Sequence, residues 1–580
     1  MDKKNTSQSN LLYFAAVAVL SLLTAFALLK AVFVSLDIDE SYAAAVAYRL
    51  YLGDFPIRDL WEPHQFAGFF LYPFVALFCS LTGGTTGLII ALRIIGSFLH
   101  LLVGFLFCRT LKDRFSHRFL VVLFFLHTLF LPKWVQLPEF ELISYWMLLL
   151  MFVCLFRYHT GSLSSRTGSV LLFLTGVFHF AALLSYPSLL LLYPFFLFAL
   201  YKNKKDNGKF LTPAVCYTLG GVLPGFLLLF CFLSYMTIPE LITNLKHINS
   251  DLSHAIPLSA RMLSHAKELV VPLLSCVLMS LGVWVLKCFF TFEKKRAWAL
   301  CTGVVLILSC FAGLIGSFFY EKGQFFLLWK YLPVAYGGLM AAYTEQKESE
   351  TVKGIFRFLI LPGFLGAFAV LLLTNMDVNT TMAKIYPAVL GTVLVLYSDL
   401  SKSMFSRIAI LSLLVPILIC RLYLLRVTGC VYTPVTASLE EIKEGPAAGI
   451  SMLPELAEPM NENTALLKQV LTPEDNFLYI GGEPLYYLVS RATVSGASTQ
   501  GTTVFNELFI DYLNEHADKN EKYPTVIMVD KELWVYPYYY ASEYNVILLD
   551  WIRNWYPYVD VFENDRMILY STRELSLSEP

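Results

Sequence analysis

Long apolar runs follow one another through the first 430 residues of this 580-residue chain, with short polar segments between them. Each run is about 17–25 residues long, which is enough for a helix to cross roughly 30 Å of hydrocarbon. Only helices and closed barrels satisfy the backbone in that environment, and these runs lack the alternation of barrel strands. The pattern therefore predicts a mainly α fold, in which residues 1–430 form a polytopic bundle of transmembrane helices.

The apolar runs predict about thirteen spans. They are expected near residues 11–35, 86–108, 119–136, 142–157, 168–185, 187–201, 211–235, 268–290, 297–319, 325–343, 355–374, 383–398 and 408–427. The first run is too long for the apolar part of a signal peptide, so we expect it to be an uncleaved span. The segment from Phe66 to Leu81 is short and contains Pro73, which favours a re-entrant or surface helix.

Basic clusters between the runs orient the spans, because cytoplasmic loops of membrane proteins are enriched in Lys and Arg. These clusters lie at residues 109–118, 157–166, 202–209, 294–296 and 402–407. With all of them in the cytoplasm, the N-terminus lies inside and the C-terminal end lies outside. The outer loops are then residues 37–65, 137–141, 186, 236–267, 320–324 and 375–382. They hold the unusual polar residues, which predicts one working site on the outer face.

The composition changes to mixed polar and charged from about Tyr432 onward. Strand-like runs and helix-like runs alternate in this part, as in a small α/β domain. The strands are expected at residues 476–480, 525–529, 546–549 and 567–570, and the helices at 462–470, 484–491 and 504–516. We therefore predict an extracytoplasmic α/β domain over residues 431–580, and its clustered aromatic residues suit either sugar stacking or packing at the membrane interface.

Composition and charge narrow the class of protein further. Only 15% of the residues are charged, against about a quarter in soluble proteins, and the net charge of −1 suggests no nucleic-acid partner. The 11 cysteines show no zinc-binding spacing and mostly lie inside apolar runs, so we expect them to be core residues. The chain is thus expected to be a multi-pass membrane protein.

The first outer loop, residues 37–65, carries six acidic residues in the segment DIDESYAAAVAYRLYLGDFPIRDLWEPHQ. Residues 40–52 have helical periodicity, and Gly53 is expected to end that helix. Asp39 then lies at the N-terminal end of a helix at the membrane boundary, where an ionised carboxylate is stabilised and kept available as a base. The alternative is that Asp37, Asp39 and Glu40 only cap the helix.

This loop resembles the first outer loop of C-type glycosyltransferases, a family that includes protein O-mannosyltransferases and the enzyme that adds aminoarabinose to lipid A. The resemblance lies in the DIDESYA segment, the glycine turn and the sequence WEPHQFAGFF. It implies an inverting glycosyltransferase of a bacterial plasma membrane. Such an enzyme moves a sugar from a polyprenyl-phosphate donor to a lipid, glycan or protein acceptor on the outer face.

The resemblance also suggests roles for individual residues. Asp39 corresponds to the essential aspartate of the family and Glu40 follows it, so both are expected to be catalytic. Glu62 matches an acidic residue at the end of the same loop. The second acidic position of the family falls at Glu139 or Glu141, and the sequence leaves both open.

Other motif positions and cations complete the expected site. A motif that usually contains lysine falls near Ser185-Tyr186-Pro187, where the lysine is missing, and a basic-Tyr-Leu-Pro motif is similar to residues 330–333. Arg58, Lys322 and Lys330 are the candidate partners of the donor phosphate. The expected substrate-binding residues are Asp37, Arg58, Glu62, His64, Glu139, Glu141, Tyr186, Lys322, Lys330 and Tyr331.

The metal requirement and two other functions stay open at this point. Asp37-Ile38-Asp39 forms a DxD pattern, so a divalent ion such as Mg²⁺ or Mn²⁺ could take part, although no metal ligand is assigned. A flippase of lipid-linked saccharides would share the many spans, but transporters usually show internal repeats and charges inside spans. A polysaccharide polymerase or ligase is kept as an alternative by the long loop 236–267 with its three histidines.

Overall fold

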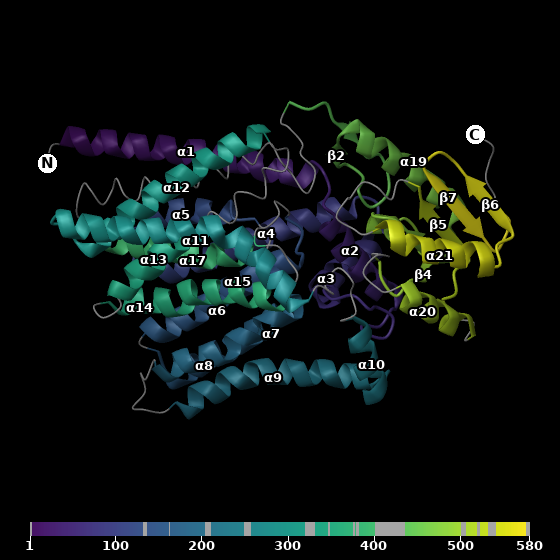
Figure 1. The fold of residues 1–580 in the computed structure, drawn as a ribbon, viewed down its shortest axis with the longest axis horizontal. Coiled ribbons are helices and arrows are strands. Elements are labelled where there is room, and N and C mark those ends of the chain that lie inside the picture. The colour runs from purple at the N-terminus through teal and green to yellow at the C-terminus, as the bar shows by residue number, and fades with distance from the viewer. Residues whose placement is uncertain are drawn as a thin grey trace.

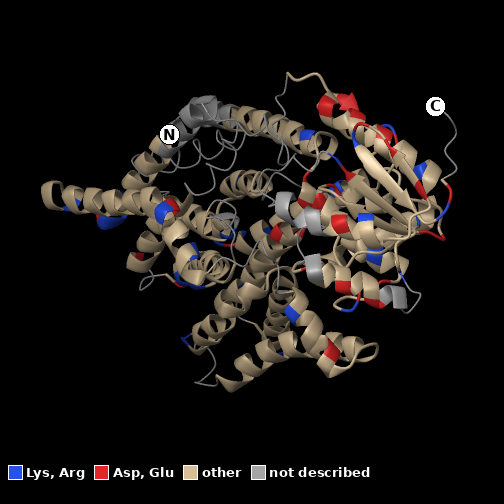
Figure 2. Cartoon of the chain, turned by 45° about the vertical axis from the view of Figure 1, so that its right-hand side comes forward, with Lys and Arg blue, Asp and Glu red and all other residues tan. Residues whose placement is uncertain are grey.

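The computed structural model divides into a helical bundle and a C-terminal domain with a β-sheet (Figure 1). It describes residues 3–131, 136–161, 163–202, 210–248, 257–319, 331–345, 349–374, 378, 382–400, 436–499, 506–518, 522–531 and 541–575. Charged residues crowd the C-terminal domain, whereas the helices of the bundle carry few (Figure 2). This division confirms the predicted fold class, a mainly α polytopic protein with a small α/β domain at its C-terminal end.

The bundle is built from long helices joined by short connections. In the described residues these are α1 (Lys3–Phe33), α2 (Ile38–Leu52), η1 (Gln65–Ala67), α3 (Gly68–Thr82), α4 (Leu88–Leu111), α5 (His117–Thr128), α6 (Phe140–Thr160), α7 (Ser165–Ser185), η3 (Pro187–Leu191), α8 (Leu192–Lys202), α9 (Leu211–Leu233), α10 (Ile238–Ile248), α11 (Leu258–Phe289), α12 (Lys294–Phe319), α13 (Tyr331–Glu345), α14 (Glu350–Ile355), η6 (Phe356–Ile360), α15 (Leu361–Leu373), η7 (Met382–Ile385) and α17 (Tyr386–Leu400).

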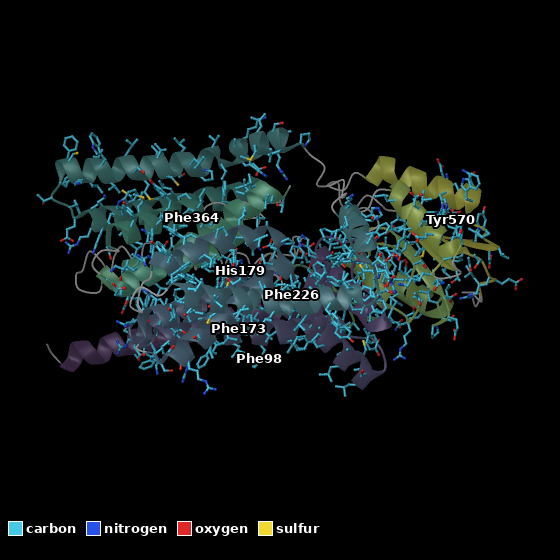
Figure 3. The ribbon with its side chains drawn as sticks, turned by 90° about the horizontal axis from the view of Figure 1, so that it is seen from below. Phe98, Phe173, His179, Phe226, Phe364 and Tyr570 are labelled. Atoms are coloured by element: carbon cyan, nitrogen blue, oxygen red, sulfur yellow. The ribbon has the colours of Figure 1, made fainter. Side chains whose placement is uncertain are left out.

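Eight helices among the described residues are long and apolar enough to cross a membrane, and three further apolar helices are shorter. Large apolar side chains such as Phe98 and Phe226 are each 65% exposed on the outside of the bundle (Figure 3). An exposed apolar surface of this kind suits a bilayer, so the protein is a multi-pass membrane protein. The predicted total of about thirteen spans stays a prediction, because the segment near 408–427 lies outside the described residues.

Two details of the bundle bear on the spans. The apolar segment from Phe66 to Leu81 forms η1 and α3, which together are long enough to cross and lie with α2 beside the C-terminal domain (Figure 1). Helices α7 and α9 approach each other closely at Gly176 and Gly220, where an added Cβ would overlap a carbonyl oxygen of the other helix. Small residues at such crossings let membrane helices pack backbone to backbone.

The C-terminal domain contains a five-stranded mixed sheet in the order β4-β3-β5-β7-β6, in which β3 runs parallel to β4 and β5, and β7 runs antiparallel to β5 and β6. A two-stranded antiparallel ladder of β1 and β2 stands apart from this sheet. The elements are β1 (Glu440–Glu441), β2 (Ser451–Met452), α19 (Pro454–Val470), β3 (Asn476–Ile480), η9 (Pro484–Leu488), β4 (Thr493–Val494), α20 (Asn506–Asp518), β5 (Val526–Asp530), α21 (Ala541–Trp555), β6 (Asp560–Glu563) and β7 (Met567–Ser571).

The strand predicted at residues 546–549 is wrong, because this segment belongs to α21. A short apolar run cannot be told from part of a buried helix by its periodicity alone. In the helix, Leu548, Trp551 and Ile552 are buried on one face and pack in a core cluster with the sheet residues Ile527 and Val529. These three buried positions are three and four residues apart, which is the spacing of one face of a helix.

The C-terminal domain packs directly on the first outer loop and the start of α4. The hydroxyl of Tyr48 donates to the carbonyl of Ser490 at 2.8 Å, and that of Thr85 donates to the carbonyl of Leu488 at 2.6 Å. Buried residues of α2, α3, α4 and the domain form one apolar cluster. The loop 37–65 and the C-terminal domain therefore lie at the same end of the bundle, here called the domain end, as the charge pattern predicted.

Candidate functional site

The N-terminus of α2 is fixed by a reciprocal capping arrangement. The carboxylate of Asp37 accepts the backbone N–H of Asp39 at 2.9 Å, and the carboxylate of Glu40 accepts the N–H of Asp37 at 3.3 Å. Such a capping box satisfies backbone donors that a helix N-terminus otherwise leaves unpaired. Asp37 and Glu40 are almost fully buried, so both acids work as parts of the scaffold.

Glu40 also forms a buried ion pair with Arg93 of α4. The guanidinium donates to both carboxylate oxygens, at 2.9 and 2.5 Å, and to the carbonyls of Val32 and Ser35. Burial raises the pKa of Glu40, while the charge of Arg93 opposes that shift. This bidentate pair ties α2 to α4 and to the end of α1. A catalytic role for Glu40 remains a prediction, since the contacts found are structural.

Asp39 differs from its two acidic neighbours in exposure. Its side chain belongs to a half-buried residue in the first turn of α2, whereas Asp37 and Glu40 are 1% and 0% exposed. The partial positive charge at a helix N-terminus favours an ionised carboxylate there. Of the three acids, Asp39 is thus the most exposed.

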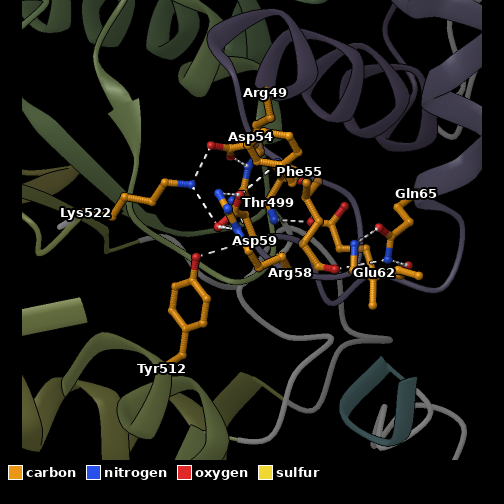
Figure 4. A network of polar contacts seen from close by, with 12 residues as sticks. Arg49, Asp54, Phe55, Arg58, Asp59, Glu62, Gln65, Thr499, Tyr512 and Lys522 are labelled. Carbon is orange, nitrogen blue, oxygen red and sulfur yellow. Dashed lines mark hydrogen bonds and ion pairs between the residues drawn. The ribbon is translucent and has the colours of Figure 1, made fainter. Parts of the chain in front are cut away.

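A charged network holds the second half of the first outer loop against the C-terminal domain (Figure 4). Arg49 of α2 pairs with Asp54 at 2.6 Å and donates to the backbone carbonyl of Asp59 at 2.8 Å. Lys522 of the C-terminal domain reaches the carboxylates of both Asp54 and Asp59, at 2.6 and 3.3 Å. These three ion pairs hold the loop in place, because each charged side chain has at least one partner of opposite charge.

Arg58 is the cation of this network with the most access to solvent. Its side chain is 42% exposed, pairs with Asp59 at 2.9 Å and lies over the ring of Phe55 at 4.3 Å. Burial alone would raise the pKa of Asp59, but Lys522 and Arg58 outweigh it and lower the pKa. An incoming phosphate would therefore have to share Arg58 with the carboxylate of Asp59.

Glu62 connects the end of the loop to the C-terminal domain. Its buried carboxylate accepts hydrogen bonds from both the backbone N–H and the hydroxyl of Thr499, the latter at 2.8 Å. Burial raises the pKa of Glu62, and Arg49 and Thr499 oppose the shift.

Nearby, Ile57 has a φ of 67°, a left-handed conformation that is held by a hydrogen bond from its N–H to the side chain of Gln65 at 2.7 Å. This conformation is strained for a β-branched residue, and it persists because the surrounding contacts hold the turn in place.

His64, Phe140 and Tyr186 bring three outer loops together. The ring of His64 stacks on Phe140 with centroids 4.1 Å apart, and the ring of Tyr186 lies 5.1 Å away. The Nδ1 atom of His64 donates to the carbonyl of Ser185 at 3.1 Å. The predicted substrate-binding residues His64 and Tyr186 are thus neighbours, although 122 positions separate them in the sequence.

The structure separates Glu139 from Glu141, which the sequence left open. Glu139 is the N-cap of α6 and accepts the backbone N–H groups of Glu141 and Leu142 at 2.6 and 2.8 Å. Glu141 instead accepts hydrogen bonds from the hydroxyl of Tyr186 and from the ammonium group of Lys384. Glu139 is therefore a capping residue, while Glu141 belongs to a buried charged cluster.

Lys384 is a residue that the sequence reasoning missed. Its side chain is 0% exposed, pairs with Glu141, donates to Ser144 at 2.7 Å and places its ammonium 3.9 Å from the ring centre of Tyr186. A lysine inside the membrane region is costly and for that reason often functional. The signal available in the sequence was its position just inside the span predicted near residues 383–398, where a charged residue is unusual. It supplies a cation beside Tyr186, where the expected lysine is absent from the local motif.

The remaining predicted residues have mixed outcomes. Tyr331 lies in an aromatic group, with its ring 5.9 Å from that of Tyr386 and 5.8 Å from that of Phe130. Lys322 and Lys330 lie outside the described residues. Within the described part of the chain, no group of three or more His, Cys, Asp or Glu side chains is arranged to hold a metal ion. Metal dependence therefore stays a question for experiment.

Comparison with known proteins yields structural likenesses alone. No protein-family model matches the chain, and no curated protein matches it. The oligosaccharyltransferase of Archaeoglobus fulgidus in its apo form is 13% identical with a TM-score of 0.44, and the match covers 90% of this chain and 70% of that one. ArnT from Cupriavidus metallidurans bound to undecaprenyl phosphate is 12% identical with a TM-score of 0.43, and the match covers 99% of both chains.

A further match is the oligosaccharyltransferase AglB from Archaeoglobus fulgidus in complex with an inhibitory peptide and a dolichol-phosphate. It is 12% identical with a TM-score of 0.41, and the match covers 98% of this chain and 75% of that one. Identities and TM-scores this low bear no weight for the chemistry, which rests on the side chains described above. AglB and ArnT are both C-type glycosyltransferases.

Proposed function

We propose that the protein is an inverting membrane glycosyltransferase that moves a sugar from a polyprenyl-phosphate donor to an acceptor hydroxyl, with Asp39 as the base. The observation that carries this proposal is the contrast within one helix turn. Asp37 and Glu40 are buried in capping and ion-pair contacts, which hold the accessible Asp39 at the positive end of α2. A rigidly held carboxylate of this kind suits general-base catalysis.

The proposed reaction begins when the acceptor hydroxyl attacks the anomeric carbon of the donor sugar. Asp39 takes the proton of that hydroxyl, and the new glycosidic bond forms as the bond from the anomeric carbon to the phosphate oxygen breaks. The leaving phosphate keeps the electron pair, so its negative charge grows in the transition state. Cations near the phosphate stabilise that charge, and a single attack from the opposite face inverts the anomeric configuration.

Two cations at the domain end suit the departing phosphate. Arg58 is partly exposed in the loop, and Lys384 is buried beside Tyr186 and Glu141. A phosphate monoester leaving group develops less charge than a diphosphate, so it depends less on a divalent ion. Titration with Mg²⁺ and Mn²⁺ after chelation tests whether either ion takes part.

We place the protein in a bacterial plasma membrane, with its N-terminus in the cytoplasm and its C-terminal domain outside. Support for this orientation comes from the basic residues, which gather at the end of the bundle away from the C-terminal domain: α4 begins beside that domain and ends at Leu111, next to Arg109 and Lys112. Positively charged loops favour the cytoplasmic side.

The test compares wild type and Asp39→Asn, both purified in detergent, against a panel of polyprenyl-phosphate sugars with lipid and peptide acceptors. Release of polyprenyl phosphate from one donor would identify the sugar. We expect Asp39→Asn to lower kcat by about 10²-fold or more while donor binding is kept. Asp113→Asn, at the opposite end of the bundle, is the matched control and should behave like wild type.

Equal rates for wild type and Asp39→Asn would contradict the assignment of the base. If the wild type binds a donor but transfers no sugar to any acceptor, the flippase alternative gains support. A reconstituted flipping assay with the same donor would then replace the transfer assay.

A further inference from the structure

A pocket of about 360 Å³ opens at the end of the bundle away from the C-terminal domain, here called the far end. It lies between the last turns of α4 and α6 and the segment that follows α4. Its polar wall includes Arg109, Lys112, Arg114 and Arg157. The same two helices begin at the domain end, where Arg93 of α4 holds Glu40 and α6 carries Glu141. The pocket is therefore separate from the proposed active site.

The charges of this pocket are strongly unbalanced. Four cations and one carboxylate, that of Asp113, line it, which leaves a net charge of +3. In the described part of the chain, Arg109, Lys112 and Arg157 form no ion pair, and Arg114 makes only a long hydrogen bond to the carbonyl of Thr160 at 3.5 Å. Unpaired cations that converge on one cavity provide a site for an anion.

Two simpler explanations account for part of this pattern. Cations near the C-terminal end of a helix interact favourably with its dipole, and cytoplasmic loops are enriched in basic residues. Other basic residues at the far end have carboxylate partners, however: Lys353 pairs with Glu350 at 2.5 Å and Lys295 pairs with Glu345 at 3.1 Å. The pocket differs from them because its cations line a cavity and lack such partners.

The pocket also has an apolar wall. Leu106 of α4, Val153 of α6 and Leu163 after the end of α6 line it beside the cations. A free phosphate ion would have no use for this surface, whereas a phospholipid places its phosphate next to the start of its acyl chains. Basic pockets between membrane helices bind anionic headgroups in this way.

We propose that the far-end pocket binds the headgroup of an anionic phospholipid. The phosphate contacts the guanidinium groups of Arg109 and Arg157 and the ammonium group of Lys112, and the acyl chains leave along the apolar wall. A bound lipid would link the ends of α4 and α6. This site does not depend on the proposed transferase activity.

The test measures lipid binding to the full-length protein in neutral detergent by native mass spectrometry. The probes are palmitoyl-oleoyl phosphatidylglycerol and palmitoyl-oleoyl phosphatidylcholine, which share their acyl chains and differ in net charge. We expect phosphatidylglycerol to bind preferentially to the wild type. The triple variant R109Q/K112Q/R157Q should lose at least about tenfold in affinity for phosphatidylglycerol, because each basic residue near an anionic headgroup contributes several-fold.

The matched control is R166Q/K202Q/K287Q, which removes three basic residues outside the pocket and should keep the affinity of the wild type. Should the triple pocket variant fail to fold, the single variants R109Q and R157Q serve instead, and each should lose affinity. Equal binding of both lipids by the wild type would overturn the proposal, as would full binding by the pocket variants. Displacement of phosphatidylglycerol by millimolar inorganic phosphate would assign the site to free phosphate and would also overturn the lipid proposal.

Discussion

At the domain end of the bundle, Glu40 and Arg93 form a buried ion pair, and so do Glu141 and Lys384, with every one of these side chains at most 2% exposed. At the far end, Arg109, Lys112 and Arg157 are exposed and line an open pocket. Buried charges cost free energy unless they are paired and hydrogen-bonded. At the domain end, pairing offsets the cost of burying these charges and the result is a rigid polar site, whereas the cations of the far-end pocket stay exposed to solvent.

Removal of Lys384 is expected to have the largest effect on stability. Lys384→Met leaves Glu141 buried without its cation, which should destabilise the fold by about 3–5 kcal/mol. The double variant Lys384→Met/Glu141→Gln removes both charges and should recover much of the melting temperature in detergent. The far-end variant Lys353→Met breaks an exposed pair and should cost less than about 1 kcal/mol.

The double variant also separates structure from function. If the pair only stabilises the fold, transfer activity should return with the melting temperature. If Lys384 stabilises the leaving phosphate, activity should stay low in the stable double variant. A single Lys384→Met variant that melts like the wild type would contradict the assigned burial of the pair.

Arg58 is expected to have an intermediate effect that concerns the donor. Arg58→Ala should raise KM for the polyprenyl-phosphate sugar by about tenfold, which corresponds to the loss of about 1.4 kcal/mol of binding. The melting temperature should change little, because the side chain is 42% exposed. Arg553→Ala, an exposed arginine of α21, is the control. An unchanged KM for Arg58→Ala would remove Arg58 from the phosphate site.

The smallest expected effect is a pH dependence within the C-terminal domain. Burial alone would raise the pKa of Asp475, but hydrogen bonds from Arg573, Thr472 and Thr525 outweigh it and lower the pKa to about 2. Because the folded-state pKa lies below the unfolded value of about 3.9, this carboxylate stabilises the domain above pH 4. The contribution should disappear as the pH falls from about 4 to about 2.

Limited proteolysis of the full-length protein over this pH range measures the effect. The wild type should become steadily more susceptible to an acid-active protease in the C-terminal domain. Asp475→Asn should be more susceptible than the wild type at pH 4 and should show a weaker change as the pH falls to about 2. Identical pH profiles for the two proteins would contradict the role of Asp475.

The sequence predicted what depends on local pattern. The apolar runs indicated the helices, and the cap residues placed Asp39 at the start of α2. It could not predict contacts between distant segments: Lys384 and Glu141 are 243 positions apart, and Thr499 and Glu62 are 437 positions apart. The strand predicted at residues 546–549 was wrong because four apolar residues do not distinguish a strand from part of a buried helix, whose longer pattern extends to Trp551 and Ile552 and packs against the sheet.

The most direct test of the proposed chemistry compares two neighbouring acids. Asp39→Asn and Glu40→Gln should be assayed side by side for kcat and for melting temperature with the donor that the wild type uses. Asp39→Asn should lose about 10²-fold in kcat with an unchanged melting temperature, because its carboxylate acts on the substrate. Glu40→Gln should lower the melting temperature, because it breaks the pair with Arg93. A stable Asp39→Asn protein that keeps its full kcat would contradict Asp39 as the base.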